Sequence, residues 1–317
     1  MLRSRKMIDL CFRSLQGLPL PARGLTTLLI ESIMARLLRT EDVIVCGYVW
    51  MSNHVHMQLF SLDCSALTAF HGGLKKSLTD FLKRLLALPR LRLWEAETTL
   101  GEVLDLQAAI DRIVYAYLNP VRAGLVRSID DYQGCNTWKE FLSATPSLNY
   151  CVEKEVPWIN APDIQPLSRE NPSVSEEIRI CAFLRQKAAK RRTHTWRIYP
   201  FKWLEAFNIS SPDAIERIRR EIVSRVRAEE ESLASSKPIT VQRQGYIVTN
   251  AYVPSTKSRK VFMYGSTKEI RIAHLNLFKW FVGCCRRCYD MFKQGVKEIP
   301  WPPECFIPPA PRLCNPI

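Results

Sequence analysis

Several features of secreted and membrane proteins are missing from this chain of 317 residues. No segment approaches the roughly 18 uninterrupted apolar residues that a membrane-spanning helix needs. The first residues are basic, but Asp9 and Arg13 interrupt the apolar stretch that follows, which argues against a signal peptide. The 11 cysteines are an odd number in a large chain without an export signal, so we expect reduced thiols in a cytoplasmic protein.

Acidic residues are too few to balance the basic ones. The chain has 45 Lys and Arg against 31 Asp and Glu, a formal net charge of +14. Such a surplus indicates a polyanionic partner, most often nucleic acid and less often a membrane surface. Residues 1–145 contain 17 Lys and Arg against 14 Asp and Glu, whereas residues 146–317 contain 28 against 17. The surplus therefore belongs mainly to the second half.

Hydrophobic periodicity predicts an α+β fold for the first part of the chain. Ser65 is expected to cap the second helix, and Asn119 followed by Pro120 is expected to end the third. The order of strands and helices favours a small antiparallel sheet flanked by helices over a doubly wound parallel sheet. The expected elements are strand 7–12, helix 26–39, strand 43–50, strand 54–60, helix 66–86 and helix 105–118.

Periodicity fades and prolines recur over residues 146–177, which predicts a linker. The chain would then consist of a first domain over residues 1–145 and a basic, mainly helical accessory domain over residues 178–317. Beyond the linker the expected elements are helices near 175–190, 213–235 and 267–294, a hairpin within 239–264 and an extended tail over 300–316.

Histidine is scarce, yet two of the five histidines lie close together. His54 and His56 stand two residues apart in the expected strand 54–60. Side chains at this spacing in a strand point to the same face, with Cα atoms roughly 6–7 Å apart. Two such imidazoles can bind one divalent cation. The alternative is an ordinary pair of partly buried histidines.

The helix expected at 105–118 adds a phenol and an amide. Tyr115 and Asn119 are four residues apart, so they are neighbours on one helix face, about 6 Å between Cβ atoms. If Pro120 ends the helix, Asn119 lies at an exposed end, where its oxygen could bind a metal. The phenol could attack a phosphate held by that metal. The alternative is that Tyr115 and Tyr117 are packing residues of an amphipathic helix.

Two motifs resemble the signatures of one enzyme family. Residues 47–57 read GYVWMSNHVHM, and residues 115–126 read YAYLNPVRAGLV. Together they resemble the HUH single-tyrosine transposases, and more narrowly the REP-associated tyrosine transposases, which are related to the transposases of insertion sequences 200 and 605. Ser52 stands where the family usually has proline, and the acidic residues 95–99 replace a Trp-Gln-Arg segment. The resemblance covers residues 1–145 and implies an HUH catalytic domain of ferredoxin-like, RRM-like fold.

The resemblance assigns a role to each site residue. His54 and His56 would bind Mg²⁺ or Mn²⁺, and Asn119 would be the third ligand. Tyr115 would be the nucleophile that forms a 5′-phosphotyrosine link. Tyr117 is the competing nucleophile, but it points about 200° around the helix from Tyr115.

The expected function is therefore cleavage and rejoining of single-stranded DNA that contains hairpins. The alternatives are a domesticated, non-catalytic protein that binds DNA hairpins and a nuclease that releases its product to water. The resemblance leaves the choice between a monomer and a homodimer open. We expect association with the bacterial nucleoid and no membrane partner.

Lysines and arginines elsewhere in the chain could contact the phosphates of DNA. The alternative is that they belong to an ordinary solvated surface. Cations and aromatic residues alternate after residue 190, a mixture that can hold single strands. The cysteines at 284, 285 and 288 are spaced poorly for a zinc site within the expected last helix. The candidate DNA-binding residues are Lys75, Lys76, Lys83, Arg84, Arg122, Lys190, Arg191 and Arg192.

Overall fold

The fold is α+β, as the sequence predicts. The computed structural model describes residues 6–15, 23–61, 64–168, 173–189, 193–234, 261–303, 305 and 307–308. Two compact units divide the chain: Arg5–Tyr264 forms the larger, and Gly265–Ile317 with Met1–Ser4 forms the smaller. No helix in these ranges is both long and apolar enough to cross a bilayer.

A five-stranded sheet in the order β2-β3-β1-β4-β7 organises the larger unit. The pairs within β2-β3-β1-β4 are antiparallel, and only the short β7 runs parallel to its neighbour β4. The strands are β1 (Lys6–Ser14), β2 (Val43–Trp50), β3 (His54–Ser61), β4 (Trp94–Val103) and β7 (Met263–Tyr264). The three strands expected from the sequence are confirmed, whereas β4 was not among the expected elements.

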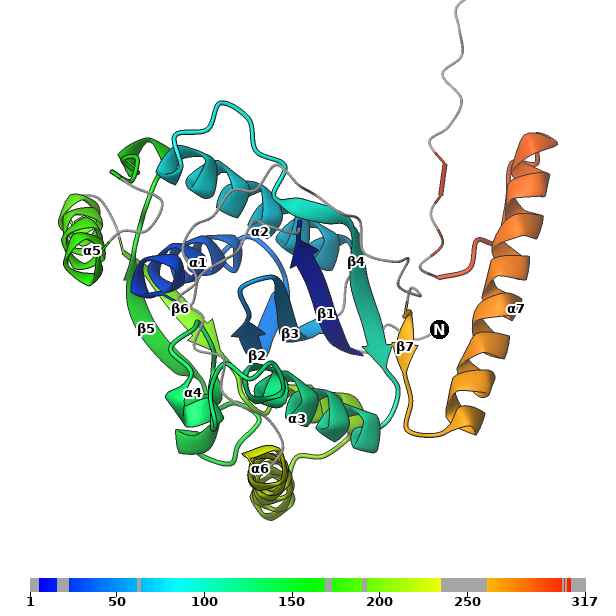
Figure 1. The fold of residues 1–317 in the computed structure, drawn as a ribbon. Helices are drawn as coiled ribbons and strands as arrows, with labels where there is room; N and C mark the ends of the chain where they lie inside the picture. The colour runs from blue at the N-terminus through cyan, green and yellow to red at the C-terminus, as the bar shows by residue number, and fades with distance from the viewer. Residues whose placement is uncertain are drawn as a thin grey trace, which may run out of the picture. The chain divides into compact units, whose positions relative to one another are not determined.

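Helices cover both faces of this sheet (Figure 1). Helices α1 (Gly24–Leu37) and α2 (Cys64–Leu85) pack on the face that carries Leu10 and Phe12 of β1. Helices α3 (Leu106–Arg122) and α6 (Pro212–Ala234) pack on the face that carries Met7. Because successive strand residues point to opposite faces, odd-numbered residues of β1 lie beneath α3.

The third helix does not end where the sequence indicates. Asp105 accepts a hydrogen bond from the Ala108 amide and caps α3, but the helix continues through Pro120 to Arg122. Pro120 lies in the last turn of the helix, which ends with the Ala123 amide donating to the Asn119 carbonyl and the Leu125 amide donating to the Pro120 carbonyl. The prediction that Asn119 lies at an exposed helix end is therefore wrong.

The second helix also begins earlier than expected. It starts at Cys64, so Ser65 lies within its first turn and is not the N-cap. Its end at Leu85, by contrast, lies one residue from the expected end, before the Ala87 turn with positive φ.

Residues 146–177, expected as a linker, contain regular structure in the larger unit. Strand β5 (Val152–Pro157) pairs with β6 (Thr193–Ile198) in a second, antiparallel sheet. Val156, Trp196 and Ile198 are buried in the same apolar cluster as α1 and α2. Pro157 is the last residue of β5 and Pro162 lies in a short helical turn, and the neighbouring Ile159 and Ile164 are buried in the same cluster.

The remaining helices agree with the sequence where it made a prediction. Ser211 caps α6 by accepting from the Ala214 amide, and Thr267 caps α7 by accepting from the Ile270 amide. The expected hairpin 239–264 and most of the tail 300–316 lie outside the described residues, apart from β7 and the start of the tail. The other elements are η1 (Ile129–Asp131), α4 (Trp138–Ser143), η2 (Ala161–Asp163), α5 (Val174–Ala189), η3 (Lys202–Phe207) and α7 (Lys268–Lys293).

Candidate active site

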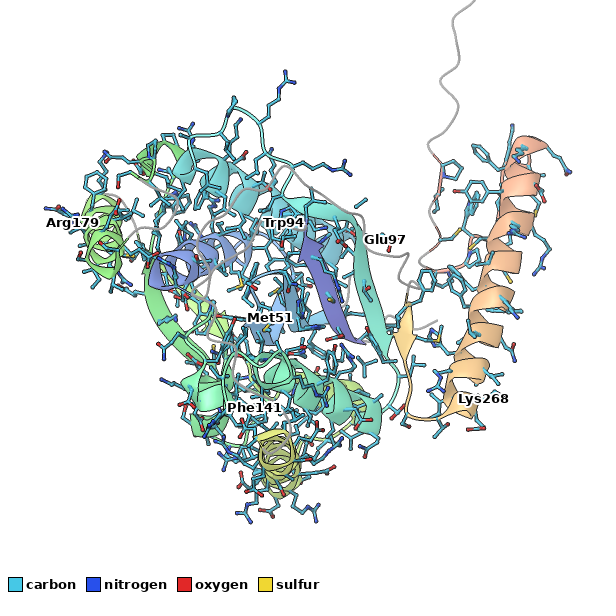
Figure 2. The ribbon with its side chains drawn as sticks, in the orientation of Figure 1. Met51, Trp94, Glu97, Phe141, Arg179 and Lys268 are labelled. Atoms are coloured by element: carbon cyan, nitrogen blue, oxygen red, sulfur yellow. The ribbon has the colours of Figure 1, made fainter. Side chains whose placement is uncertain are left out.

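The two histidines of β3 lie side by side on the sheet face that α3 covers. The ring centroids of His54 and His56 are 5.1 Å apart, and the partner of His56 on β1 is Cys11. Met51, labelled in Figure 2, begins the turn that leads from β2 to His54. In this turn the Asn53 Oδ1 lies 2.6 Å from the His54 Nδ1. If Nδ1 carries the proton, the His54 Nε2 presents a free lone pair.

Both imidazoles are neutral at neutral pH. Burial lowers the pKa of His54 to about 3, with further lowering by the neighbouring His56 and Arg13. Burial also lowers the pKa of His56 to about 3, and Arg112 and Arg13 act in the same direction. Unprotonated imidazoles are the form that binds metal ions.

Asn119 lies with this pair and not in solvent. It is 8% exposed, and its side chain opposes the lowering of the His54 pKa. Among the described residues, neither the Asn119 Nδ2 nor the His56 Nδ1 has a hydrogen-bond partner. Buried polar atoms without partners are unusual in native structures and indicate a site that a further polar group can enter.

Two imidazoles and an amide form a donor set that can hold a divalent cation. All three groups are neutral, so a bound cation would keep its full charge for a substrate anion. No group of three or more His, Cys, Asp and Glu side chains in the described ranges could hold a metal. A metal site here would therefore need a ligand of another kind, which the Asn119 amide could supply.

Tyr115 lies beside the histidines and close to two arginines. Its ring centroid is 5.3 Å from that of His56, and the two rings meet edge to face at 82°. The guanidinium carbon of Arg112 lies 4.5 Å from the Tyr115 ring centroid, and that of Arg122 lies 5.1 Å from it. α3 thus presents two arginines to the same phenol, one turn before it and two turns after it.

Sequence reasoning missed the residues that hold Arg112. Its Nη2 and Nε lie 2.7 and 3.0 Å from the Oδ2 of Asp9, which is fully buried on β1. Burial raises the pKa of Asp9, and Arg112 opposes that rise. The Gln58 amide donates to the other carboxylate oxygen at 3.4 Å. An aspartate in the middle of an apolar strand was the available signal, because a buried carboxylate requires a partner.

Tyr117 lies in a different environment. It is 2% exposed, its hydroxyl is 3.2 Å from the Thr137 Oγ1, and its ring centroid is 4.8 Å from that of Trp138. Burial raises its pKa well above the ordinary range. Tyr117 is therefore a packing residue, whereas Tyr115 lies with the histidines.

The structure does not bring the expected DNA-binding residues together. Helix α2, which carries Lys75, lies on the opposite sheet face from His54 and His56. The half-buried Lys75 ammonium lies 2.7 Å from the Thr98 Oγ1 and 5.3 Å from the Phe12 ring centroid.

The other candidates differ in their surroundings. Lys76 and Arg84 are exposed, whereas Lys83 is half-buried. Arg122 does lie at the site, with its Nη2 also 2.5 Å from Glu229 of α6. Residues 190–192, with Lys190, Arg191 and Arg192, lie outside the described residues.

Comparisons with known proteins give little support for a family. No protein-family model matches the chain, and no curated protein matches it. One solved structure that resembles it is described as "Structure of the REP associates tyrosine transposase bound to a REP hairpin". The identity is 12%, the TM-score is 0.36, and the match covers 44% of this chain and 79% of that chain.

Proposed function

We propose that this protein cleaves and rejoins single-stranded DNA, with Tyr115 as the nucleophile. His54, His56 and the oxygen of Asn119 would hold a Mg²⁺ or Mn²⁺ ion beside it. The observation that carries the proposal is the contact of the Tyr115 ring with both His56 and Arg112. A nucleophile, a candidate cation site and fixed positive charge thus lie together, which is what transfer of a phosphate diester requires.

The proposed step exchanges one phosphodiester for another. The Tyr115 hydroxyl oxygen forms a bond to phosphorus while the bond from phosphorus to the 3′ oxygen breaks. The phenolic proton leaves to solvent, and the 3′ oxygen takes up a proton from solvent. The DNA is left with a 5′-phosphotyrosine link and a free 3′-hydroxyl, which can attack the link and reverse the step.

The residues around Tyr115 contribute in different ways. A phenol is a weak nucleophile at neutral pH. The guanidiniums of Arg112 and Arg122 place fixed positive charge beside the Tyr115 ring, where an anionic phosphate would react. When bound, the cation would draw charge from a phosphate oxygen. A DNA hairpin as the preferred substrate follows from the resemblance of the two motifs.

A covalent adduct tests the proposal. Protein, Mg²⁺ or Mn²⁺ and a labelled single-stranded oligonucleotide that contains a hairpin are separated on a denaturing gel. We expect a shifted band of protein with DNA that disappears in Tyr115→Phe and persists in the matched control Tyr117→Phe. An adduct that survives in Tyr115→Phe but disappears in Tyr117→Phe would overturn the assignment of the nucleophile.

The same reactions, run both on the denaturing gel and on a native gel that preserves non-covalent complexes, separate the alternative functions. Binding of the hairpin without an adduct under either cation would indicate a non-catalytic DNA-binding protein. Cleaved DNA without a protein-linked product would indicate a nuclease that uses water. Either result would contradict the strand-transfer proposal.

A further inference from the structure

We propose that Tyr264 is a positioning residue for Tyr115: it fixes the Arg112 guanidinium against the Tyr115 ring, so that a strand from the second half of the chain completes the site. This inference rests on the proposed function, because it concerns the reaction of Tyr115. It adds residues that neither motif contains.

One guanidinium contacts both tyrosine rings. The Arg112 Cζ lies 4.3 Å from the ring centroid of Tyr264 and 4.5 Å from that of Tyr115. The Arg112 side chain is only 16% exposed. Contacts between a cation and an aromatic face are strongest when water is excluded, as it largely is here.

Asp9 joins Tyr264 and Arg112 into one unit. The buried Asp9 carboxylate pairs with Arg112, and Tyr264 opposes the rise in the Asp9 pKa that burial causes. Arg112 is thus held in its own plane by Asp9 and on its face by Tyr264. A guanidinium with these contacts cannot rotate away from Tyr115 without leaving a buried carboxylate unpaired, which is costly.

The sheet itself holds the Tyr264 ring in place. Tyr264 pairs with Val103, and its carbonyl accepts a hydrogen bond of 2.9 Å from the Leu104 amide. The ring lies against Gly101 of β4, where a Cβ would be 2.2 Å from the Tyr264 Cε2. A residue with a side chain at 101 would therefore displace the ring.

The arrangement explains why a partly exposed phenol can face the histidines. Tyr115 touches His56 on one side, and its other described ring contacts are with Arg112 and Arg122. Arg122 also pairs with Glu229, whose side chain is 40% exposed, so Arg112 is the more firmly held of the two. A displacement of about 1 Å in a reacting group can reduce a rate by about 100-fold. Loss of the support for Arg112 should therefore slow the reaction without weakening the binding of DNA.

The test measures the single-turnover rate of adduct formation and, separately, the affinity for the same oligonucleotide. Tyr264→Leu removes the ring, and Gly101→Ala displaces it, because the added Cβ would lie 2.2 Å from the Tyr264 Cε2. We expect each to lower the rate by about 10-fold or more while the Kd changes by less than about twofold. Tyr264→Phe keeps the ring and should recover most of the rate that Tyr264→Leu loses.

A matched control and a double variant make the result specific. Phe262→Leu removes an exposed aromatic ring two residues away and should leave rate and affinity unchanged. Adding Gly101→Ala to Tyr264→Leu should cause no further loss, because both changes act on one ring. Additive losses, or a Tyr264→Leu protein with the rate of the unmodified chain, would overturn the inference while the proposed function stood. Absence of an adduct from the unmodified chain would overturn the proposed function itself and the inference with it.

Discussion

Two tyrosines of one helix have opposite surroundings, although only Ala116 separates them. Tyr115 lies among His56, Arg112 and Arg122, whereas Tyr117 packs against Trp138 in the core. The difference follows from helix geometry, since residues two apart point to different faces. Residue type alone therefore does not identify the candidate nucleophile, but helix phase does.

Tyr117→Phe should lower stability and leave adduct formation intact. The hydroxyl of Tyr117 lies 3.2 Å from the Thr137 Oγ1, and its loss should reduce the free energy of unfolding by about 1 kcal/mol. Urea denaturation measures the change. The Thr137 hydroxyl keeps its hydrogen bond from the Tyr48 amide at 2.9 Å, so a loss of several kcal/mol would contradict this view.

Acid should destabilise the protein through His56. Its pKa is near 3 in the folded chain and near 6.5 in the unfolded chain, so the unfolded state binds a proton first as the pH falls. The free energy of unfolding then decreases from pH 6.5 down to about pH 3. At pH 5 the contribution of this one imidazole is about 2 kcal/mol.

Denaturation at pH 7 and pH 5 in the presence of EDTA, for the unmodified protein and His56→Gln, checks this. The chelator keeps metal binding out of the comparison. The variant should lose about 2 kcal/mol less than the unmodified protein between the two pH values. Equal losses would show that His56 is not responsible.

At the scale of elements, α3 depends on α6 for its position. Ile215, Ile218, Ile222 and Val226 of α6 are buried in the same cluster as α3. The Arg225 guanidinium also lies 2.7 Å from Asp111 of α3. A helix assigned from the sequence to the accessory half thus supports the helix that carries the candidate nucleophile.

Ile222→Ala should therefore destabilise the larger unit. Ile222 is fully buried, and its truncation should cost about 2–5 kcal/mol of unfolding free energy. The exposed Arg217→Ala on the same helix is the control and should change stability by less than about 0.5 kcal/mol. Similar midpoints of denaturation for the two variants would argue against the packing of α6 on α3.

Strand β4 shows why some elements escape sequence analysis. Its first four residues, Trp94 to Glu97, are partly or fully exposed. Figure 2 labels Trp94 and Glu97. Glu95 and Glu97 add charge where alternation of apolar and polar residues would reveal a strand. The strand forms because it pairs with β1, and such pairing is not a property of the local sequence.

At the scale of the whole molecule, the larger unit reaches far beyond the first 145 residues. It extends over Arg5–Tyr264 and so includes β5, β6 and α6. Its apolar clusters combine side chains from both halves of the sequence, such as Leu10 with Trp196. The basic surplus of the second half is therefore partly carried by the same unit as the candidate site.

Truncation tests this organisation. A chain ending at residue 145 would lose Val156, Trp196 and Ile198 from the core and should not unfold cooperatively. A chain ending at residue 264 keeps the larger unit and should melt in a single transition followed by circular dichroism. A cooperative transition in the shorter chain would instead support a domain boundary near residue 145.

The sequence by itself determined the α+β class, the strands β1, β2 and β3, and the shared face of His54 and His56. These features depend on the periodicity of apolar residues and on the spacing of residues close together in the sequence, both of which can be read from a short segment. Only the tertiary structure placed Asn119 in a buried position and joined Asp9, Arg112 and Tyr264. In the sequence, Asp9 and Tyr264 lie near opposite ends of the larger unit. The contacts that bring both to Arg112 depend on the pairing of β1, β4 and β7. Contacts of that kind arise from the packing of the whole chain, so no local pattern contains them.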